Sequence, residues 1–167
     1  MNPSPNRILA SIPADVFQAL QPHLKLVDLV LGEVIAEPGS TIKRVYFPHT
    51  GAISLVVAMT VGEMIETAMV GNDGVLNAAS SLDGKISPNK SIVQLAGVAS
   101  VIDADAIRPI ADASTAFRSI IIRHEQALFA QAQQSAACNA SHLVESRMCR
   151  WLLRMRDLAN SDNLFLT

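Results

Sequence analysis

Apolar and polar positions repeat with two different periods along the chain, and the changes between them predict its main elements. A leading helix is predicted over 12–24, where an apolar residue recurs at every fourth position: Ile12, Val16, Leu20 and Leu24. From Lys25 to Ile102 the pattern becomes short strand-sized segments between Gly, Pro, Asn and Asp. Such frequent turn signals indicate a β-sandwich or barrel.

The clearest strand pair is a hairpin over 52–59 and 64–70, with its turn at Thr60–Gly62. After Asp103 the pattern becomes helical. A short helical piece over 104–110 is expected to be interrupted at Pro109, because proline lacks the N–H that a helix interior uses. Two longer helices are predicted over 115–140, which contains no Gly or Pro, and over 142–159.

The long helix over 115–140 carries a stripe whose spacing alternates between four and three. Its members are Phe117, Ile121, His124, Leu128, Gln131, Ser135 and Cys138. This spacing is typical of a seam between two helices, so the stripe predicts a homodimer with its tightest packing near Leu128. The alternative is a helix packed on the sheet of its own domain.

The last helix is amphipathic. One face carries Val144, Met148, Trp151, Met155 and Leu158. Another carries Arg147, Arg150 and Arg154, which we interpret as a solvated helix face. The final residues, Leu164–Thr167, have the pattern of a strand entering a part that the chain does not contain.

Composition narrows the class of protein. With 167 residues, half of them apolar, the chain suits one domain with a connecting element and is not intrinsically disordered. No apolar run reaches the roughly 18–20 residues that cross a bilayer. The net charge of −2 is unlike that of a freestanding nucleic-acid-binding domain. The first residues lack an apolar signal segment, so the expected location is the cytoplasm.

Candidate chemistry is sparse. The sequence has no GxSxG, Walker, HExxH or GxGxxG motif, which argues against an enzyme. The two cysteines, Cys138 and Cys149, exclude a disulfide framework and a four-cysteine cluster within this chain. The histidines stand singly, and the lack of a histidine pair two residues apart argues against a cupin-like metalloenzyme. No metal site is predicted.

Two segments resemble the Crp/Fnr family of bacterial transcription regulators. Glu37-Pro38-Gly39 through Tyr46 to Gly51 is similar to the early roll of that family. The segment from Cys138 to Arg147 and on through Trp151 to Leu153 resembles its hinge and the first helix of its DNA-binding half. The resemblance extends over most of the chain, from about Phe17 to Thr167.

The resemblance implies a fold that is mainly β with α: a jelly-roll-like β-roll of the cyclic-nucleotide-binding type, then a long dimerisation helix and one further helix. It divides the chain into a sensory domain (1–112), the dimerisation helix (113–140), and a hinge with the first helix of a truncated DNA-binding domain (141–167). The winged helix-turn-helix is absent, so specific DNA binding by these residues alone is not expected.

The nucleotide site that the resemblance implies is degenerate. The family's Gly-Glu pair falls near Asn77-Ala78, and its Arg-Ser pair falls at Lys90-Ser91. The helix positions that would meet the base fall near Ala132 and Gln133. Ala78 cannot accept a ribose hydroxyl and Lys90 lacks the guanidinium fork, so cyclic AMP is not expected to bind and no cofactor is assigned. A stand-alone module that regulates a partner protein remains the alternative.

Overall fold

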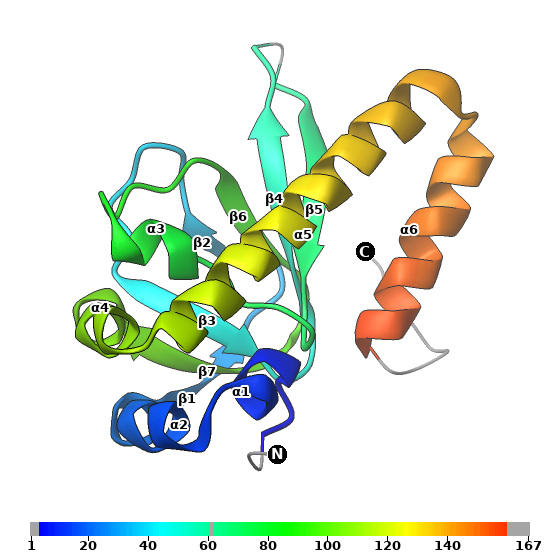
Figure 1. Cartoon of the computed structure of the whole chain (residues 1–167). Helices are drawn as coiled ribbons and strands as arrows, with labels where there is room; N and C mark the ends of the chain where they lie inside the picture. Colours follow the sequence, from blue (N-terminus) through cyan, green and yellow to red (C-terminus); the bar gives the residue numbers. More distant parts are fainter. Residues whose placement is uncertain (1–3, 61, 160–167) are drawn as a thin grey trace.

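Residues 4–60 and 62–159 are described by a computed structural model. Within them, seven strands form a β-roll of two antiparallel sheets (Figure 1). One sheet has the order β1-β7-β3, with β1 at Lys25–Leu29, β7 at Gly97–Asp103 and β3 at Arg44–Pro48. The other has the order β2-β6-β4-β5, with β2 at Val34–Ala36, β6 at Lys90–Leu95, β4 at Ala52–Ala58 and β5 at Met64–Val70.

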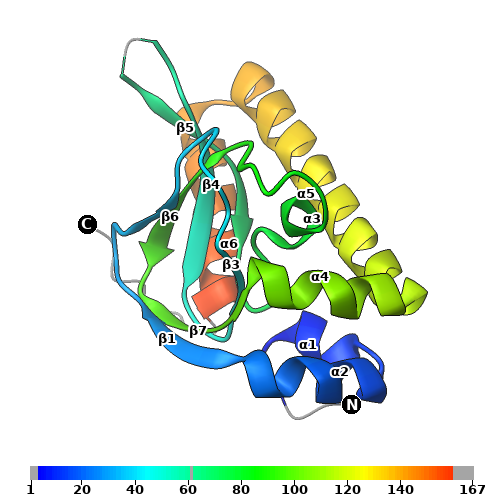
Figure 2. The same cartoon turned by 90° about the vertical axis from the view of Figure 1, so that its left-hand side faces the viewer.

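Helices flank the roll and extend beyond it. At one end of the roll lie α1 (Arg7–Ser11), α2 (Ala14–Leu20), the short 3-10 helix η1 (Gln21–His23) and α4 (Ala104–Ala113) (Figure 2). The helix α3 (Ala78–Leu82) lies between β5 and β6 in sequence. The long helix α5 (Thr115–Ser141) crosses the roll diagonally, and α6 (Val144–Ala159) turns back beside it (Figure 1).

The apolar core has three parts. The largest lies between the end helices and the sheet β1-β7-β3, and its most buried members include Leu9, Leu20, Phe47, Ile107 and Phe117. A second lies between the two sheets, around Ile53 and Val93. The third lies under α6, where Met155 and Leu158 cover Ala52 and Met69. The roll therefore buries part of every long element that follows it.

The predicted hairpin and both long helices are confirmed. Pairing of β4 with β5 runs from Ile53 opposite Val70 to Ala58 opposite Met64, with a bulge between Leu55 and Val56. The helix predicted over 12–24 is shorter, because Ile12 is the C-cap of a separate helix, α1. That helix has only five residues and one buried apolar side chain, so its periodicity gives no signal.

The expected interruption at Pro109 is wrong, since α4 continues through this residue to Ala113. Proline removes a hydrogen bond to the carbonyl four residues earlier, here that of Asp105. Asp105 and Pro109 are both exposed, so water can hydrate the freed carbonyl while Ile107 and Ala111 hold the helix on the core. The predicted strand at Leu164–Thr167 lies outside the described residues.

Candidate functional site

The segment between β5 and β6 shapes the first candidate site. Asn77 adopts a left-handed backbone with φ 69° directly before α3, a conformation that asparagine tolerates better than most residues. Its side-chain amide donates to the carbonyl of Arg44 at 3.1 Å, and Ser81 Oγ donates to the Asn77 carbonyl at 2.7 Å. These bonds fasten α3 to β3 and bring Asn77 to the edge of two cavities.

The first cavity lies between this segment and α5 and is small. Its volume is about 40 Å³, and its lining includes Leu55, Asn77, Asn89, Glu125 and Leu128. Pockets that hold organic ligands measure roughly 300–1,000 Å³. This space therefore has room for a few water molecules and not for a nucleotide. Burial raises the pKa of Glu125 at its rim.

The residues predicted for the nucleotide site are not gathered around this cavity. Of the six, Asn77 lines it. Ala78 is fully buried in the core beside it, and Lys90 pairs with Glu37, the residue after β2, at 3.0 Å. Ser91 is buried between β2 and β4, and its hydroxyl has no partner. On α5, Ala132 is half-buried and Gln133 is exposed.

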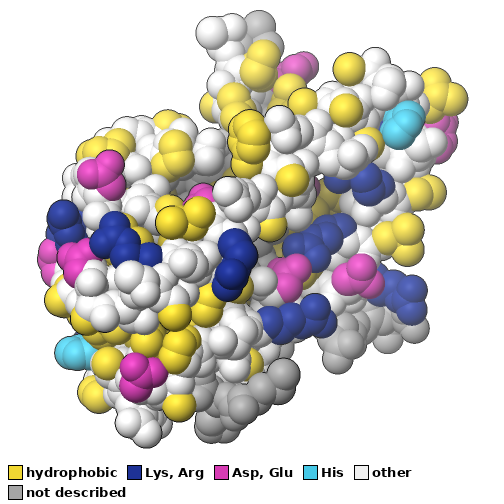
Figure 3. All heavy atoms as spheres, viewed as in Figure 1, with side chains coloured by type: hydrophobic (Ala, Val, Ile, Leu, Met, Phe, Trp, Pro, Cys, Tyr) yellow, Lys and Arg dark blue, Asp and Glu magenta, His cyan; other side chains and the backbone are white. Residues whose placement is uncertain are grey.

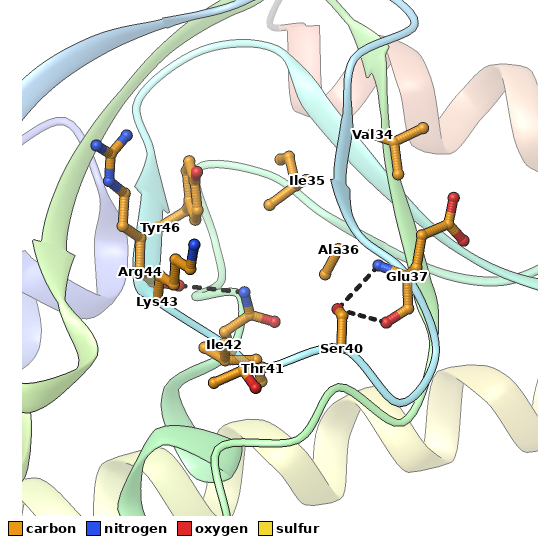
Figure 4. Close-up of a pocket in the computed structure, with 11 residues that line it drawn as sticks. Val34, Ile35, Ala36, Glu37, Ser40, Thr41, Ile42, Lys43, Arg44 and Tyr46 are labelled. Carbon is orange, nitrogen blue, oxygen red and sulfur yellow. Dashed lines mark hydrogen bonds between the residues drawn. The ribbon is translucent and has the colours of Figure 1, made fainter.

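The second cavity is open, measures about 570 Å³, and lies where β2 leads into β3 (Figure 4). Sequence reasoning missed this cavity, although the two adjacent basic residues Lys43 and Arg44 were an available signal. Figure 4 shows Ile35 and Tyr46 in its wall and Lys43 and Arg44 on one side. Burial raises the pKa of the Tyr46 phenol, and the neighbouring Arg44 acts in the opposite direction. The cavity can therefore offer cationic and phenolic donors to a polar ligand.

His124 connects α5 to the loop that follows β5, at Val75. Its Nε2 accepts from the backbone N–H of Val75 at 3.2 Å, which places the ring proton of the neutral form on Nδ1. That Nδ1 is buried and has no hydrogen-bond partner. Burial lowers the pKa of His124, and the nearby Asp73 partly opposes this. The ring is therefore neutral at physiological pH and fixes the loop against the helix.

The predicted dimer seam lies on the face of α5 that packs on its own chain. Phe117, Ile121, His124, Ser135 and Cys138 are all buried within the monomer. Leu128 packs against the core between the sheets, and Gln131 accepts a hydrogen bond from the backbone N–H of Met69. Within one chain the stripe therefore packs on the roll, as in the alternative to a two-helix seam, and its part in a dimer stays a prediction.

The arginine stripe of α6 is also not the solvated face that the sequence suggested. Arg147, Arg150 and Arg154 are half-buried. Arg154 pairs with Asp73 at 2.8 Å. Arg150 and Arg147 donate over longer distances, 3.4 Å each, to Ser135 Oγ and Asn139 Oδ1 of α5. The stripe therefore faces α5 and the roll.

Neither a metal cluster nor a membrane span is found in the part of the chain that the structure describes. No group of three or more His, Cys, Asp or Glu residues there could hold a metal ion. Likewise, no described helix combines the length and apolarity needed to cross a bilayer.

Comparisons with solved structures identify the fold. A regulator of the Crp/Fnr family from Eubacterium rectale superposes with a TM-score of 0.75 at 11% identity, covering 98% of this chain and 76% of that one. The c-di-GMP-responsive global regulator CLP of Xanthomonas campestris gives 0.69 at 11% identity, covering 89% and 75%. The regulatory subunit of a cAMP-independent protein kinase A from Trypanosoma brucei gives 0.60 at 13% identity, covering 71% and 43%.

No protein-family model matches the sequence, and neither does any curated protein. At these identities the structural likeness establishes the fold. The predicted fold class, a β-roll of the cyclic-nucleotide-binding type with a long helix and one further helix, is confirmed.

Proposed function

We propose that this chain is the sensory and dimerisation part of a cytoplasmic Crp/Fnr-type transcription regulator whose signal is not cyclic AMP. In this proposal the roll and its end helices (1–112) sense the signal, the long helix (113–140) dimerises, and 141–167 lead toward a DNA reader. DNA contact is made only through a winged helix-turn-helix outside the described residues. The chain itself is not catalytic.

The small cavity beside Asn77 carries the part of the proposal that concerns cyclic AMP. Its 40 Å³ lies far below the volume of a nucleotide pocket. The methyl group of Ala78 is buried and accepts no hydrogen bond, and the ammonium group of Lys90 is already paired with Glu37. A nucleotide would have to open the space and break that pair. The kinase subunit from Trypanosoma brucei, which is described as cAMP-independent, supports a use of this fold without cyclic AMP.

Calorimetry with cyclic AMP tests this directly, with 5′-AMP as the matched control. We expect no saturable heat for either nucleotide at micromolar concentration. Losing one charged hydrogen bond costs about 1.5–3 kcal/mol, which is roughly 10–100-fold in affinity before any cost of opening the cavity. A micromolar isotherm with cyclic AMP and none with 5′-AMP would contradict the proposal.

Dimerisation is assigned to the face of α5 opposite the buried stripe. Ile122 and Phe129 are exposed there by 55% and 65%, and Gln126 and Gln133 lie on the same side at seam spacing. From Gln126 to Ser141 the helix carries no Asp, Glu, Lys or Arg. An exposed and uncharged helix half rich in alanine allows a second helix to approach closely.

Sedimentation tests the dimer. The parent chain should have a mass near twice 17.9 kDa. Phe129→Glu should shift it to monomer, because two carboxylates would face each other in the seam. Leu26→Glu, at a residue 68% exposed on β1, is the control and should leave the dimer intact. A parent chain that is monomeric at high micromolar concentration would rule this assignment out.

A module that regulates a partner protein is the second candidate, since a kinase regulatory subunit shares the fold. Footprinting distinguishes these two candidate functions: the complete natural gene product is tested for protection of one DNA sequence that persists at moderate salt. A defined footprint supports the regulator, and none at all supports the partner-binding module.

A further inference from the structure

A third hollow lies on the other side of α5, between β5 and α6. Its volume is about 610 Å³, which is in the range of small-molecule sites. Its lining includes Met64, Glu66, Asn139, Arg147, Arg150 and Trp151. Basic side chains gather on this side of the molecule between α5 and α6 (Figure 3). It is separate from both cavities beside Asn77.

Two arginine side chains in its wall form no ion pair among the described residues, although Arg150 lies close enough to Glu66 to lower the pKa of that carboxyl against the effect of burial. The Nε atoms of Arg147 and Arg150 are buried without a hydrogen-bond partner. Each guanidinium has five N–H donors, and its one acceptor is a neutral oxygen at 3.4 Å. A positive charge that is partly removed from water favours a counter-charge at this wall.

Glu66, which also lines the hollow, has hydrogen-bond partners of its own, and burial raises the pKa of its carboxyl. Its Oε2 accepts from Ser54 Oγ of β4 at 2.5 Å and from Trp151 Nε1 of α6 at 3.3 Å. Glu66 therefore connects the sheet to α6 and leaves the N–H groups of both arginines available. Exposed apolar side chains, Met64 at 55% and Met148 at 53%, complete the hollow together with the Trp151 ring.

We propose that this hollow binds a small organic anion, namely a carboxylate carried on a flat apolar body. The carboxylate would accept from the planar guanidinium groups of Arg147 and Arg150, a geometry that suits two parallel hydrogen bonds. The apolar body would lie against Trp151 and Met148. Such a molecule bridges β5, α5 and α6, so its binding stabilises α6 in the docked position. The site does not depend on the proposed function, because it is built from the chain's own contacts.

Trp151 is the only tryptophan of the chain and therefore reports on this site. The experiment titrates the protein with benzoate and follows Trp151 emission. Benzyl alcohol serves as the neutral analogue and inorganic phosphate as the anion without an apolar body. We expect a saturable change with benzoate, and at least about tenfold weaker binding of the other two probes.

Variants test whether benzoate binding depends on the positive charge of Arg147. Arg147→Gln should weaken benzoate binding by about tenfold, whereas Arg147→Lys, which keeps the charge, should weaken it less. Arg108→Gln removes an exposed arginine on α4, far from the hollow, and should bind benzoate as the parent does. Circular dichroism confirms that each variant is folded. No saturable change, equal binding of benzyl alcohol, or an equal loss in Arg108→Gln would overturn the proposal.

Discussion

The two halves of α5 are held in different ways, although they form one uninterrupted helix of 27 residues. The first half places Phe117 and Ile121 in the main apolar core. The second half buries only small or weakly polar side chains, Ser135 and Cys138. Burial of large side chains stabilises roughly in proportion to the apolar area removed from water. The first half is therefore held by large apolar side chains in the core, and the second half by smaller side chains and polar contacts to the roll and to α6.

The polar contacts of α5 also differ between its two halves. In the first half His124 makes one short connection to the roll, through the backbone of Val75. In the second half Gln131 accepts from the backbone N–H of Met69 on β5, and two longer contacts run to α6 through Arg147 and Arg150 at 3.4 Å each. Long contacts to neutral acceptors stabilise little. Beyond Gln131, the end of α5 that leads to α6 is therefore the part that a ligand or partner can reposition most easily.

The largest expected effect tests the first half. Phe117→Ala should lower the free energy of unfolding by about 3–5 kcal/mol, because it leaves a cavity in the main core. The matched control is Phe129→Ala on the same helix, where the ring is exposed. For the monomer its effect should stay within about 0.5 kcal/mol. Urea denaturation of both variants measures the difference, and equal losses would contradict the division of the helix.

Next in size is a change at the loop that meets His124. A Cβ added at Gly74 would lie 2.7 Å from His124 Nε2 and 3.0 Å from Val70 Cγ1. Gly74→Ala should therefore cost about 1–3 kcal/mol of stability by overpacking. Gly71→Ala is the comparison, since its Cβ would meet only the flexible end of Leu158 on α6. Thermal unfolding should show the smaller loss for Gly71→Ala, with increased hydrogen exchange confined to α6.

Sequence reasoning located both long helices because their periodicity is long and unbroken. It could not decide which way the stripe of α5 faces, since four-three spacing serves a two-helix seam and a helix lying on its own sheet equally well. Two members of the stripe, His124 and Gln131, are polar and also suit a seam between helices. Only the folded structure shows that they bond to the backbone N–H groups of Val75 and Met69.

The candidate sites were harder to predict for a related reason. The order of residues along the chain predicted the place of Asn77, but the cavity volume depends on side chains from β4, α3, α5 and the loops between them, which are far apart in sequence. The arginines of α6 have the spacing of a solvated face. Their burial follows from the turn at His142, which folds α6 back onto α5, and this turn carries no strong sequence signal.

A pH titration examines the first half of α5 through His124. Its folded-state pKa is lowered by burial, so at pH below about 6.5 the unfolded chain binds more protons than the folded one. Stability should therefore fall as the pH drops from 7.5 toward 5.5, by at most about 1.4 kcal/mol per pH unit from this residue. The slope should be smaller in His124→Gln. His49, whose pKa burial also lowers, acts in the same direction, so His49→Gln is the control that keeps the contribution of His124.

The smallest expected effect belongs to the ion pair that holds the far end of α6. Arg154 Nη2 lies 2.8 Å from Asp73 Oδ2, and the two side chains are 29% and 28% exposed. A partly exposed pair of this kind contributes about 0.5–1 kcal/mol. Arg154→Gln and Asp73→Asn should each destabilise by about that amount, and the double variant by less than the sum, because the second change finds no partner to remove. Urea denaturation of all four proteins gives the coupling energy. Adding 0.5 M salt should reduce it. Additive losses would show that Asp73 and Arg154 act separately and that α6 is held at this end by Met155 and Leu158 alone.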